Sequence, residues 1–252
     1  MNETELTQRL AQNLYAVRER ISRAAARSGR GGANVRLVAV TKYVEPAVIR
    51  ALRAVGAVDL GENRVQQLTA RASELGADFS PFTGGPPGAA ARWHMIGHLQ
   101  RNKVRAMLGA SRVLHSLDSL RLAQALSDEA RKQGIVVEAF VELNLGQEQA
   151  KSGMDIELAE REISDIAELP GLNVIGLMGM APLDTAQSAE QARPYFARLR
   201  TLHADWLQRG LLADSARELS MGMSGDFEVA VEEGATCVRL GSVLFEGVAE
   251  NG

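Results

Sequence analysis

The chain has 252 residues, of which 46% are hydrophobic and 23% are charged, and its formal net charge is −3. It can therefore bury one substantial core, and it has no charge excess that would attract nucleic acid or an anionic membrane. The single cysteine, Cys237, excludes an intramolecular disulfide and fits a reducing compartment. The acidic N-terminus argues against a secretory signal, and no apolar stretch approaches the roughly 18 residues of a membrane helix. We therefore expect a cytoplasmic protein without nucleic-acid or membrane partners.

The first predicted element is an amphipathic helix over residues 3–28, where leucine, valine and isoleucine recur every three to four residues. From residue 36 onward, short apolar runs alternate with longer helical patterns. These runs are eight strand candidates, at residues 36–40, 57–60, 93–96, 112–115, 136–143, 174–178, 218–222 and 237–240. Helical patterns lie between them, for example at residues 45–55, 64–75, 120–133, 156–168 and 189–208.

Alternation of strand and helix predicts parallel strands joined by right-handed crossovers. Eight such units in a chain of this length favour a closed (β/α)8 barrel (a TIM barrel) that forms a single domain over residues 1–252, with residues 3–28 as an extra N-terminal helix. An open, doubly wound sheet is the alternative. The Pro/Gly-rich segment 80–88 is interpreted as an insertion in a loop.

Polar or small residues follow each strand candidate, at the end of the barrel where active sites of this fold are built. Lys42 comes directly after the first strand. Burial there would favour the free amine, which is the form that attacks an aldehyde to make a Schiff base. A solvated or ion-paired surface lysine is the alternative at this position.

The loops after the last two strands contain Ser224, Gly225, Gly241 and Ser242. Barrels often bind phosphate at these two loops, because glycines allow the backbone N–H groups to approach an anion and serines add donors. Ser224 could instead cap a helix that begins near Phe227. A phosphate site and a strand-end lysine in one barrel are what a phosphorylated aldehyde cofactor needs.

Arg239 is expected to point into the mouth of the barrel from the eighth strand. A guanidinium stays protonated at ordinary pH, so beside a pyridine nitrogen it would donate a hydrogen bond and keep that nitrogen unprotonated. The cofactor would then be a weaker electron sink. The alternative is an ion pair with a neighbouring glutamate such as Glu62.

The order and spacing of several short motifs resemble the pyridoxal 5′-phosphate (PLP) homeostasis proteins of the YggS/PROSC family. The similar segments extend over about residues 6–247 and are 38–42, 61–63, 93–103, 115–118, 151–153, 176–180, 220–226 and 239–242. Two positions depart from the family's pattern: Ser242 stands where threonine is usual, and Phe245-Glu246-Gly247 replaces Phe-Gly-Ala-Arg.

The resemblance implies a barrel like the N-terminal domain of alanine racemase, with Lys42 carrying PLP as a Schiff base. It places the phosphate against Ser224, Gly241 and Ser242, and the pyridine nitrogen near Arg239. Asn63 and Met223 complete the set of cofactor contacts that it implies. No residue is assigned a catalytic role, since the family is regarded as a PLP carrier or regulator of vitamin B6 balance.

Three functions are weighed: a PLP carrier or buffer, a PLP-dependent racemase, and a barrel that binds phosphate but no aldehyde. Racemases with this barrel resemble the chain over their first domain only, and their added β domain supplies a catalytic tyrosine and helps to build a dimer. The tyrosines of this chain offer no clear second base. We therefore expect a monomer that delivers PLP to apo-enzymes or buffers it. His94 and His98 are not expected to bind a metal, because no third ligand accompanies them.

Overall fold

The computed structural model describes residues 1–31, 35–76, 79–80, 91–146, 153–182 and 188–248. Parallel strands follow one another in the order β2-β1-β9-β8-β7-β6-β5-β4, and a direct pairing of β2 with β4 closes the ring. The strands are β1 (Arg36–Val40), β2 (Asp59–Glu62), β4 (Ala91–Met95), β5 (Val113–Leu117), β6 (Val137–Leu143), β7 (Leu172–Gly179), β8 (Glu218–Ser220) and β9 (Cys237–Leu240). The two-residue β3 (Phe79–Ser80) pairs with the start of β4. The predicted eight-stranded barrel is confirmed, and the open sheet is wrong.

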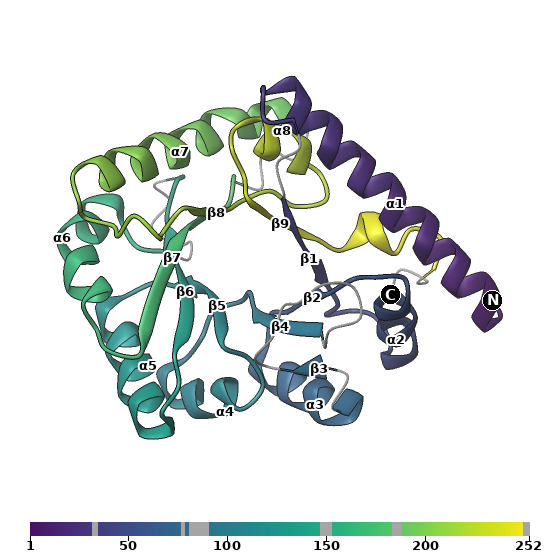
Figure 1. Ribbon diagram of the computed structural model, residues 1–252, viewed down its shortest axis with the longest axis horizontal. Helices are drawn as coiled ribbons and strands as arrows, with labels where there is room; N and C mark the ends of the chain where they lie inside the picture. Colours follow the sequence, from purple (N-terminus) through teal and green to yellow (C-terminus); the bar gives the residue numbers. More distant parts are fainter. Residues whose placement is uncertain (32–34, 77–78, 81–90, 147–152, 183–187, 249–252) are drawn as a thin grey trace.

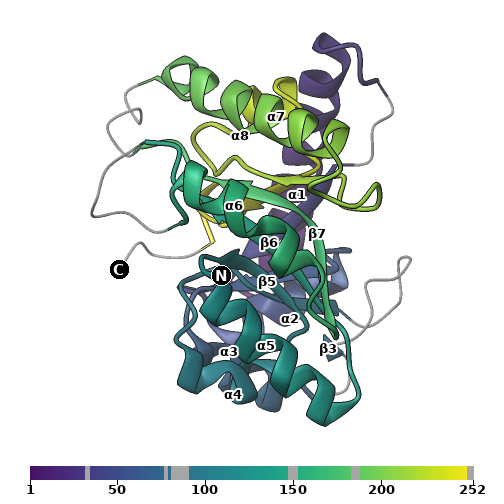
Figure 2. The same cartoon turned by 90° about the vertical axis from the view of Figure 1, so that its left-hand side faces the viewer.

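Helices surround the strands, as Figures 1 and 2 show. They are α1 (Glu3–Arg27), α2 (Pro46–Ala54), α3 (Val65–Leu75), α4 (Val104–Leu108), α5 (Leu120–Gln133), α6 (Ile156–Ala167), α7 (Arg193–Gln208) and α8 (Phe227–Glu232), with short 3-10 helices at Arg101–Lys103, Ala189–Ala192 and Ser242–Leu244. The helix predicted over residues 189–208 begins as a 3-10 turn, and α7 has proline in its first turn, where a missing N–H costs little. No helix in the described part of the chain is long and apolar enough to cross a membrane.

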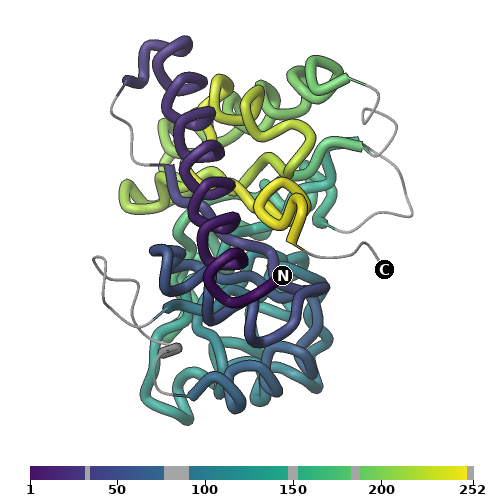
Figure 3. Tube along the Cα trace, turned by 90° about the vertical axis from the view of Figure 1, so that its right-hand side faces the viewer, coloured from purple at the N-terminus to yellow at the C-terminus, as the bar shows by residue number. Residues whose placement is uncertain are grey.

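The N-terminal helix α1 lies along the outside of the barrel (Figure 3), where it packs against α2 and α8. It begins with a capping box, in which Asn2 and Glu5 each accept the other's backbone N–H at 2.9 Å. Its buried face includes Leu10 and Leu14. Asn13 donates to the carbonyl oxygens of Leu244 and Glu246, both at 3.0 Å. The segment that departs from the family's usual sequence is therefore held against α1.

Side chains alternate between the two faces of the barrel wall, because successive residues of a strand point to opposite sides. The outward-facing residues join the helices in one large apolar core. A smaller apolar cluster consists of Val38, Val113, Phe140, Ile175, Met178 and Cys237. The alternation places this cluster inside the barrel. Burial raises the pKa of the Cys237 thiol to about 11, so this cysteine is packed and unreactive, as expected.

Two strand boundaries differ from the sequence prediction in ways that matter for the site. β2 starts at Asp59 and continues through Glu62, whose buried carboxylate is bonded to Thr41 and ion-paired with Arg71. Asn63 is therefore the first residue past the strand. β5 continues to Leu117, which places His115 within the strand, fully buried, and not at the rim where it was expected.

Candidate functional site

Three adjacent strands, β1, β9 and β8, bring the predicted cofactor residues to one end of the barrel. Lys42 follows β1. Its side chain is half-buried, which is less burial than the sequence predicts at this position. Its Nζ atom lies 4.8 Å from the centre of the exposed Tyr43 ring, and its carbonyl oxygen accepts a hydrogen bond from Gln67 Nε2 at 3.0 Å. The backbone at Lys42 is thus fixed by α3.

The loops after β8 and β9 are joined directly, because the N–H of Gly241 donates to Ser224 Oγ at 3.1 Å. Ser224 is half-buried and Ser242 is exposed. The alternative role of Ser224 as a helix cap is wrong: the residue before α8 is Asp226, whose carboxylate accepts the Met223 N–H at 2.6 Å. Two serine hydroxyl groups, one of them accepting the Gly241 N–H, therefore lie beside the end of β1.

Arg239 is 4% exposed and reaches the interior from β9. Its Nη1 atom donates to Ser220 Oγ at 2.5 Å, and its Nη2 atom to the carbonyl of Gly179 at 3.5 Å. Burial lowers the pKa of this guanidinium, which stays protonated near neutral pH because its usual pKa is so high. The alternative pairing with Glu62 is wrong, since that carboxylate is engaged by Thr41 and Arg71.

Asn63 and Met223, the other two expected contacts, are both half-buried at the same end of the barrel. A Cβ atom at Gly97 would lie 2.2 Å from the carbonyl oxygen of Asn63, so only glycine allows the loops after β2 and β4 to pack this closely. The position of Asn63 is therefore fixed by the neighbouring loop.

The two histidines of segment 93–103 have different environments, because His94 lies within β4 and His98 lies beyond its end. His94 is fully buried, whereas His98 bonds Asp118 at 3.0 Å on the surface. Among the residues that the structure describes, no group of three His, Cys, Asp or Glu side chains could hold a metal ion. The family segment 151–153 lies largely outside the described residues, as does most of the Pro/Gly-rich loop.

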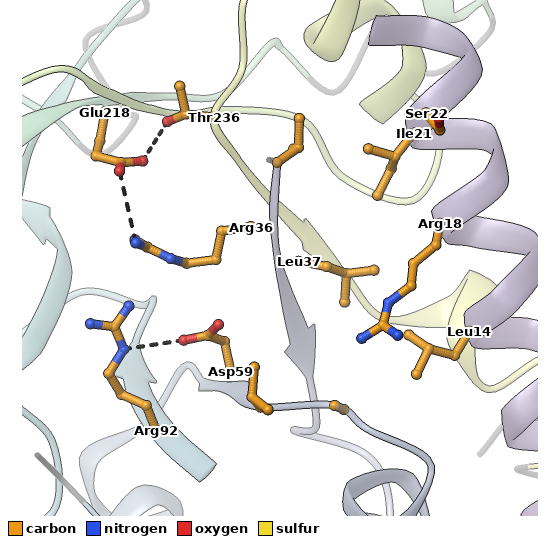
Figure 4. Close-up of a pocket in the computed structure, with 13 residues that line it drawn as sticks. Leu14, Arg18, Ile21, Ser22, Arg36, Leu37, Asp59, Arg92, Glu218 and Thr236 are labelled. Atoms are coloured by element: carbon orange, nitrogen blue, oxygen red, sulfur yellow. Dashed lines mark hydrogen bonds and ion pairs between the residues drawn. The ribbon is translucent and has the colours of Figure 1, made fainter. Parts of the chain in front are cut away.

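A cavity of about 590 Å³ lies at the opposite end of the barrel, between α1 and the starts of β1, β2, β4 and β8. Figure 4 shows Arg92 against Asp59 and Arg36 toward Glu218 on one side, with α1 side chains on the other. These charges are paired with one another, at 3.1 Å for Arg92–Asp59 and 3.8 Å for Arg36–Glu218. This cavity is distinct from the site predicted from the sequence.

Comparison with known proteins identifies the family of the chain. The family model for the alanine racemase N-terminal domain matches residues 12–248. A pyridoxal phosphate homeostasis protein of Aquifex aeolicus is 40% identical over 234 residues, which cover 93% of this chain and 96% of that protein. The chain belongs to the pyridoxal phosphate homeostasis family. Members of this family thus match it over almost their whole length.

Solved structures agree with the family assignment. PipY of Synechococcus elongatus, a structure with PLP bound, has a TM-score of 0.78 and 32% identity, and the match covers 94% of this chain and 99% of PipY. Alanine racemase of Clostridium difficile shares the fold alone, with a TM-score of 0.68 and 17% identity. That match covers 94% of this chain and 56% of the racemase.

Sequence reasoning did not identify the polar side chains that connect Arg239 to the opposite end of the barrel. They are Asp59, His94, His115 and Ser220, joined by hydrogen bonds of 2.8–2.9 Å. The signal that could have found them is the two-residue period of each strand, which places all four on the inward face once strand boundaries are known.

Proposed function

We propose that this protein binds PLP through Lys42 at the carboxyl end of the barrel and serves PLP homeostasis without turnover of a substrate. The observation that carries the proposal is the Ser224–Gly241 hydrogen bond, which unites the two phosphate-type loops next to the strand that bears Lys42. The PLP-bound structure of PipY, 32% identical over nearly the full length, supports the choice of ligand.

The residues present fit this cofactor group by group. The Lys42 amine is half-buried and so keeps access to an incoming aldehyde. Ser224, Gly241 and Ser242 would hold the phosphate with hydroxyl and N–H donors, and Arg239 would donate to the pyridine nitrogen. Asn63 and Met223 would contact the rest of the cofactor. When bound, PLP supplies an aldehyde that condenses reversibly with a primary amine and loses water.

Release and recapture are the chemistry that these residues suit best. Lys42 is only partly buried and Ser242 is exposed, so neither end of the proposed site is sealed from water. Carbanion chemistry needs the opposite, namely a closed site with a second base within reach. We infer a carrier or buffer that is not an enzyme. A racemase-like activity is the second candidate, based on the shared barrel alone.

The proposal also covers the oligomeric state, location and partners of the protein. We propose a monomer in the cytoplasm whose partners are PLP and apo-forms of PLP-dependent enzymes that receive it. The single buried cysteine fits a reducing compartment.

Mass spectrometry after borohydride reduction tests the attachment. PLP added to the purified protein should give a yellow solution and, after reduction, one adduct on the peptide that contains Lys42. Lys42→Ala should lose both the colour and the adduct. Lys132→Ala is the matched control, since that lysine is 72% exposed on α5 and should leave both unchanged. A colourless wild type, or an adduct on another lysine, would contradict the proposal.

A further inference from the structure

A continuous chain of hydrogen bonds runs through the interior of the barrel. Asp59 Oδ1 lies 2.8 Å from His94 Nε2, and His94 Nδ1 lies 2.9 Å from His115 Nε2. His115 Nδ1 lies 2.8 Å from Ser220 Oγ, which accepts from Arg239 Nη1 at 2.5 Å. Five side chains from β2, β4, β5, β8 and β9 thus link the two ends of the barrel.

These groups are removed from water. His94, His115 and Ser220 are 0% exposed, Arg239 is 4% exposed and Asp59 is 6% exposed. Inward-facing apolar side chains form a cluster beside them, and the His115 ring lies 4.5 Å from the Phe140 ring. Buried polar groups are costly unless each has a partner, so the five side chains depend on one another.

The chemistry of the partners fixes the direction of every bond. Asp59 is a carboxylate, because His94 and Arg92 hold its pKa at about 2 against the effect of burial. A carboxylate only accepts, so His94 donates from Nε2. Burial lowers the pKa of His94 to about 4, so its ring is neutral at pH 7 and its Nδ1 accepts.

The same reasoning continues to the other end. His115 donates from Nε2 to His94, and since burial also lowers its pKa well below the usual value, its Nδ1 must accept. Ser220 must then be the donor of this hydrogen bond, through its hydroxyl proton. With its only hydrogen committed to His115, the Ser220 oxygen presents lone pairs to Arg239. Every donor therefore points from the Arg239 cation toward the Asp59 anion.

We propose that His94, His115 and Ser220 are positioning residues: through this one-way chain, anchored on Asp59, they hold the Arg239 guanidinium where it meets the pyridine ring. The inference rests on the proposed function, since it assigns Arg239 to PLP. The anchor is itself fixed, because Arg92 bonds Asp59 at 3.1 Å (Figure 4) and Glu138 at 3.1 Å.

Ser220 is the link on which the guanidinium most depends. Its 2.5 Å contact with Nη1 is far shorter than the 3.5 Å contact of Nη2 with Gly179. Removing the hydroxyl leaves Arg239 Nη1 and His115 Nδ1 without this partner in a site closed to water. The guanidinium is then free to turn away from the pyridine ring.

The first test uses the PLP-free protein and nitrogen NMR of the histidine rings at pH 7. His94 and His115 should both be neutral and carry their proton on Nε2. In Ser220→Ala, the Nδ1 resonance of His115 should shift, because it loses its donor. A proton on Nδ1 of either ring, or a charged ring, would break the direction of the chain and overturn the inference.

The second test measures PLP affinity and the absorption maximum of the bound cofactor. Ser220→Ala should weaken binding at least about tenfold, as expected for loss of a hydrogen bond to a charged group, and should shift the absorption maximum. Ser220→Thr, which keeps the hydroxyl, should restore both. His115→Asn interrupts the same chain of hydrogen bonds. If only one of Ser220→Ala and His115→Asn folds, the measurement is made on that variant.

Ser111→Ala is the matched control, because Ser111 is also fully buried and also donates one short hydrogen bond, to the Trp93 carbonyl at 2.6 Å, outside this chain. Unchanged affinity and absorption in Ser220→Ala, or equal losses in Ser111→Ala, would overturn the inference and leave the proposed function standing. A wild type that binds no PLP would instead overturn the proposed function, while the NMR experiment would still report on the chain itself.

Discussion

At the scale of single residues, the site combines groups of opposite accessibility. Ser242 is exposed and Lys42 is half-buried, whereas Arg239 and the side chains behind it are buried in the barrel. Exposed groups can exchange a ligand and buried groups can fix its orientation. The buried histidines have a further consequence for stability, because they must remain neutral in the folded state.

The stability of the protein should fall as the pH falls from about 6.5 to about 4. His94 has a pKa of about 4 in the folded state and an ordinary value of 6.5, so in this window only the unfolded chain binds the proton. A shift of this size corresponds to about 3 kcal/mol. Facing His94 are Asp59, His115, Arg92 and Arg36; His115 adds to the loss, because burial also lowers its pKa.

Urea unfolding at a series of pH values checks this, with His94→Gln as the comparison. Burial raises the pKa values of Glu62 and Asp226, and these groups act in the opposite direction in both proteins. The difference between wild type and variant therefore isolates His94. The free energy of unfolding should depend less on pH in the variant. Parallel curves for the two proteins between pH 4 and 6.5 would show that His94 is not held neutral.

At the scale of elements, α1 is the part of the chain that lies outside the repeating strand–helix pattern, and it stabilises the barrel by packing. Leu10→Ala should lower the free energy of unfolding by about 2–5 kcal/mol, because Leu10 is 0% exposed among apolar neighbours. Tyr15→Ala, at a position 68% exposed on the same helix, should change it by no more than about 0.5 kcal/mol. Equal effects of the two changes in denaturant unfolding would show that α1 is not docked as described.

Most elements could be predicted because their apolar periods are clean: β1, α5 and β9 have the predicted bounds. The ends of β2 and β5 could not, because charged and polar residues that read as loop are tolerated in strands when they are paired inside the fold. Glu62, which pairs with Arg71, is one case, and His115 is another. Sequence patterns predict structure from residues that are close along the chain. These two pairings join residues that are 9 and 105 positions apart, so a local pattern does not reveal them.

The candidate site was predictable in part for the same reason. Lys42, Ser224 and Gly241 lie in the loops after β1, β8 and β9, so the fold alone brings them to one end of the barrel. The interior chain requires the exact register of five strands, and a shift of one residue would turn its side chains outward. No role was accordingly predicted for His94, which links Asp59 and His115.

At the scale of the whole molecule, closure of the barrel through β2 and β4 separates two ends with different chemistry. One end carries the Lys42 amine and the joined loops after β8 and β9. The other carries a cavity of about 590 Å³ lined by paired arginines and carboxylates. Ser242 is exposed at the first of these ends, and such access suits transfer of a bound aldehyde more than its protection.

Direct delivery of PLP should therefore be observable. The protein is loaded with PLP, freed of unbound cofactor and mixed with the apo-form of a PLP-dependent enzyme, with and without an excess of a reagent that traps free PLP. We expect the enzyme to regain activity at a rate that the trap does not change. Lys42→Ala mixed with the same amount of PLP is the control, and the trap should abolish reactivation of the enzyme by this mixture.

If the trap also abolishes reactivation by the wild type, the protein releases PLP to solution and acts as a buffer. Sustained racemisation of amino acids by the protein alone would contradict both roles, because neither needs turnover.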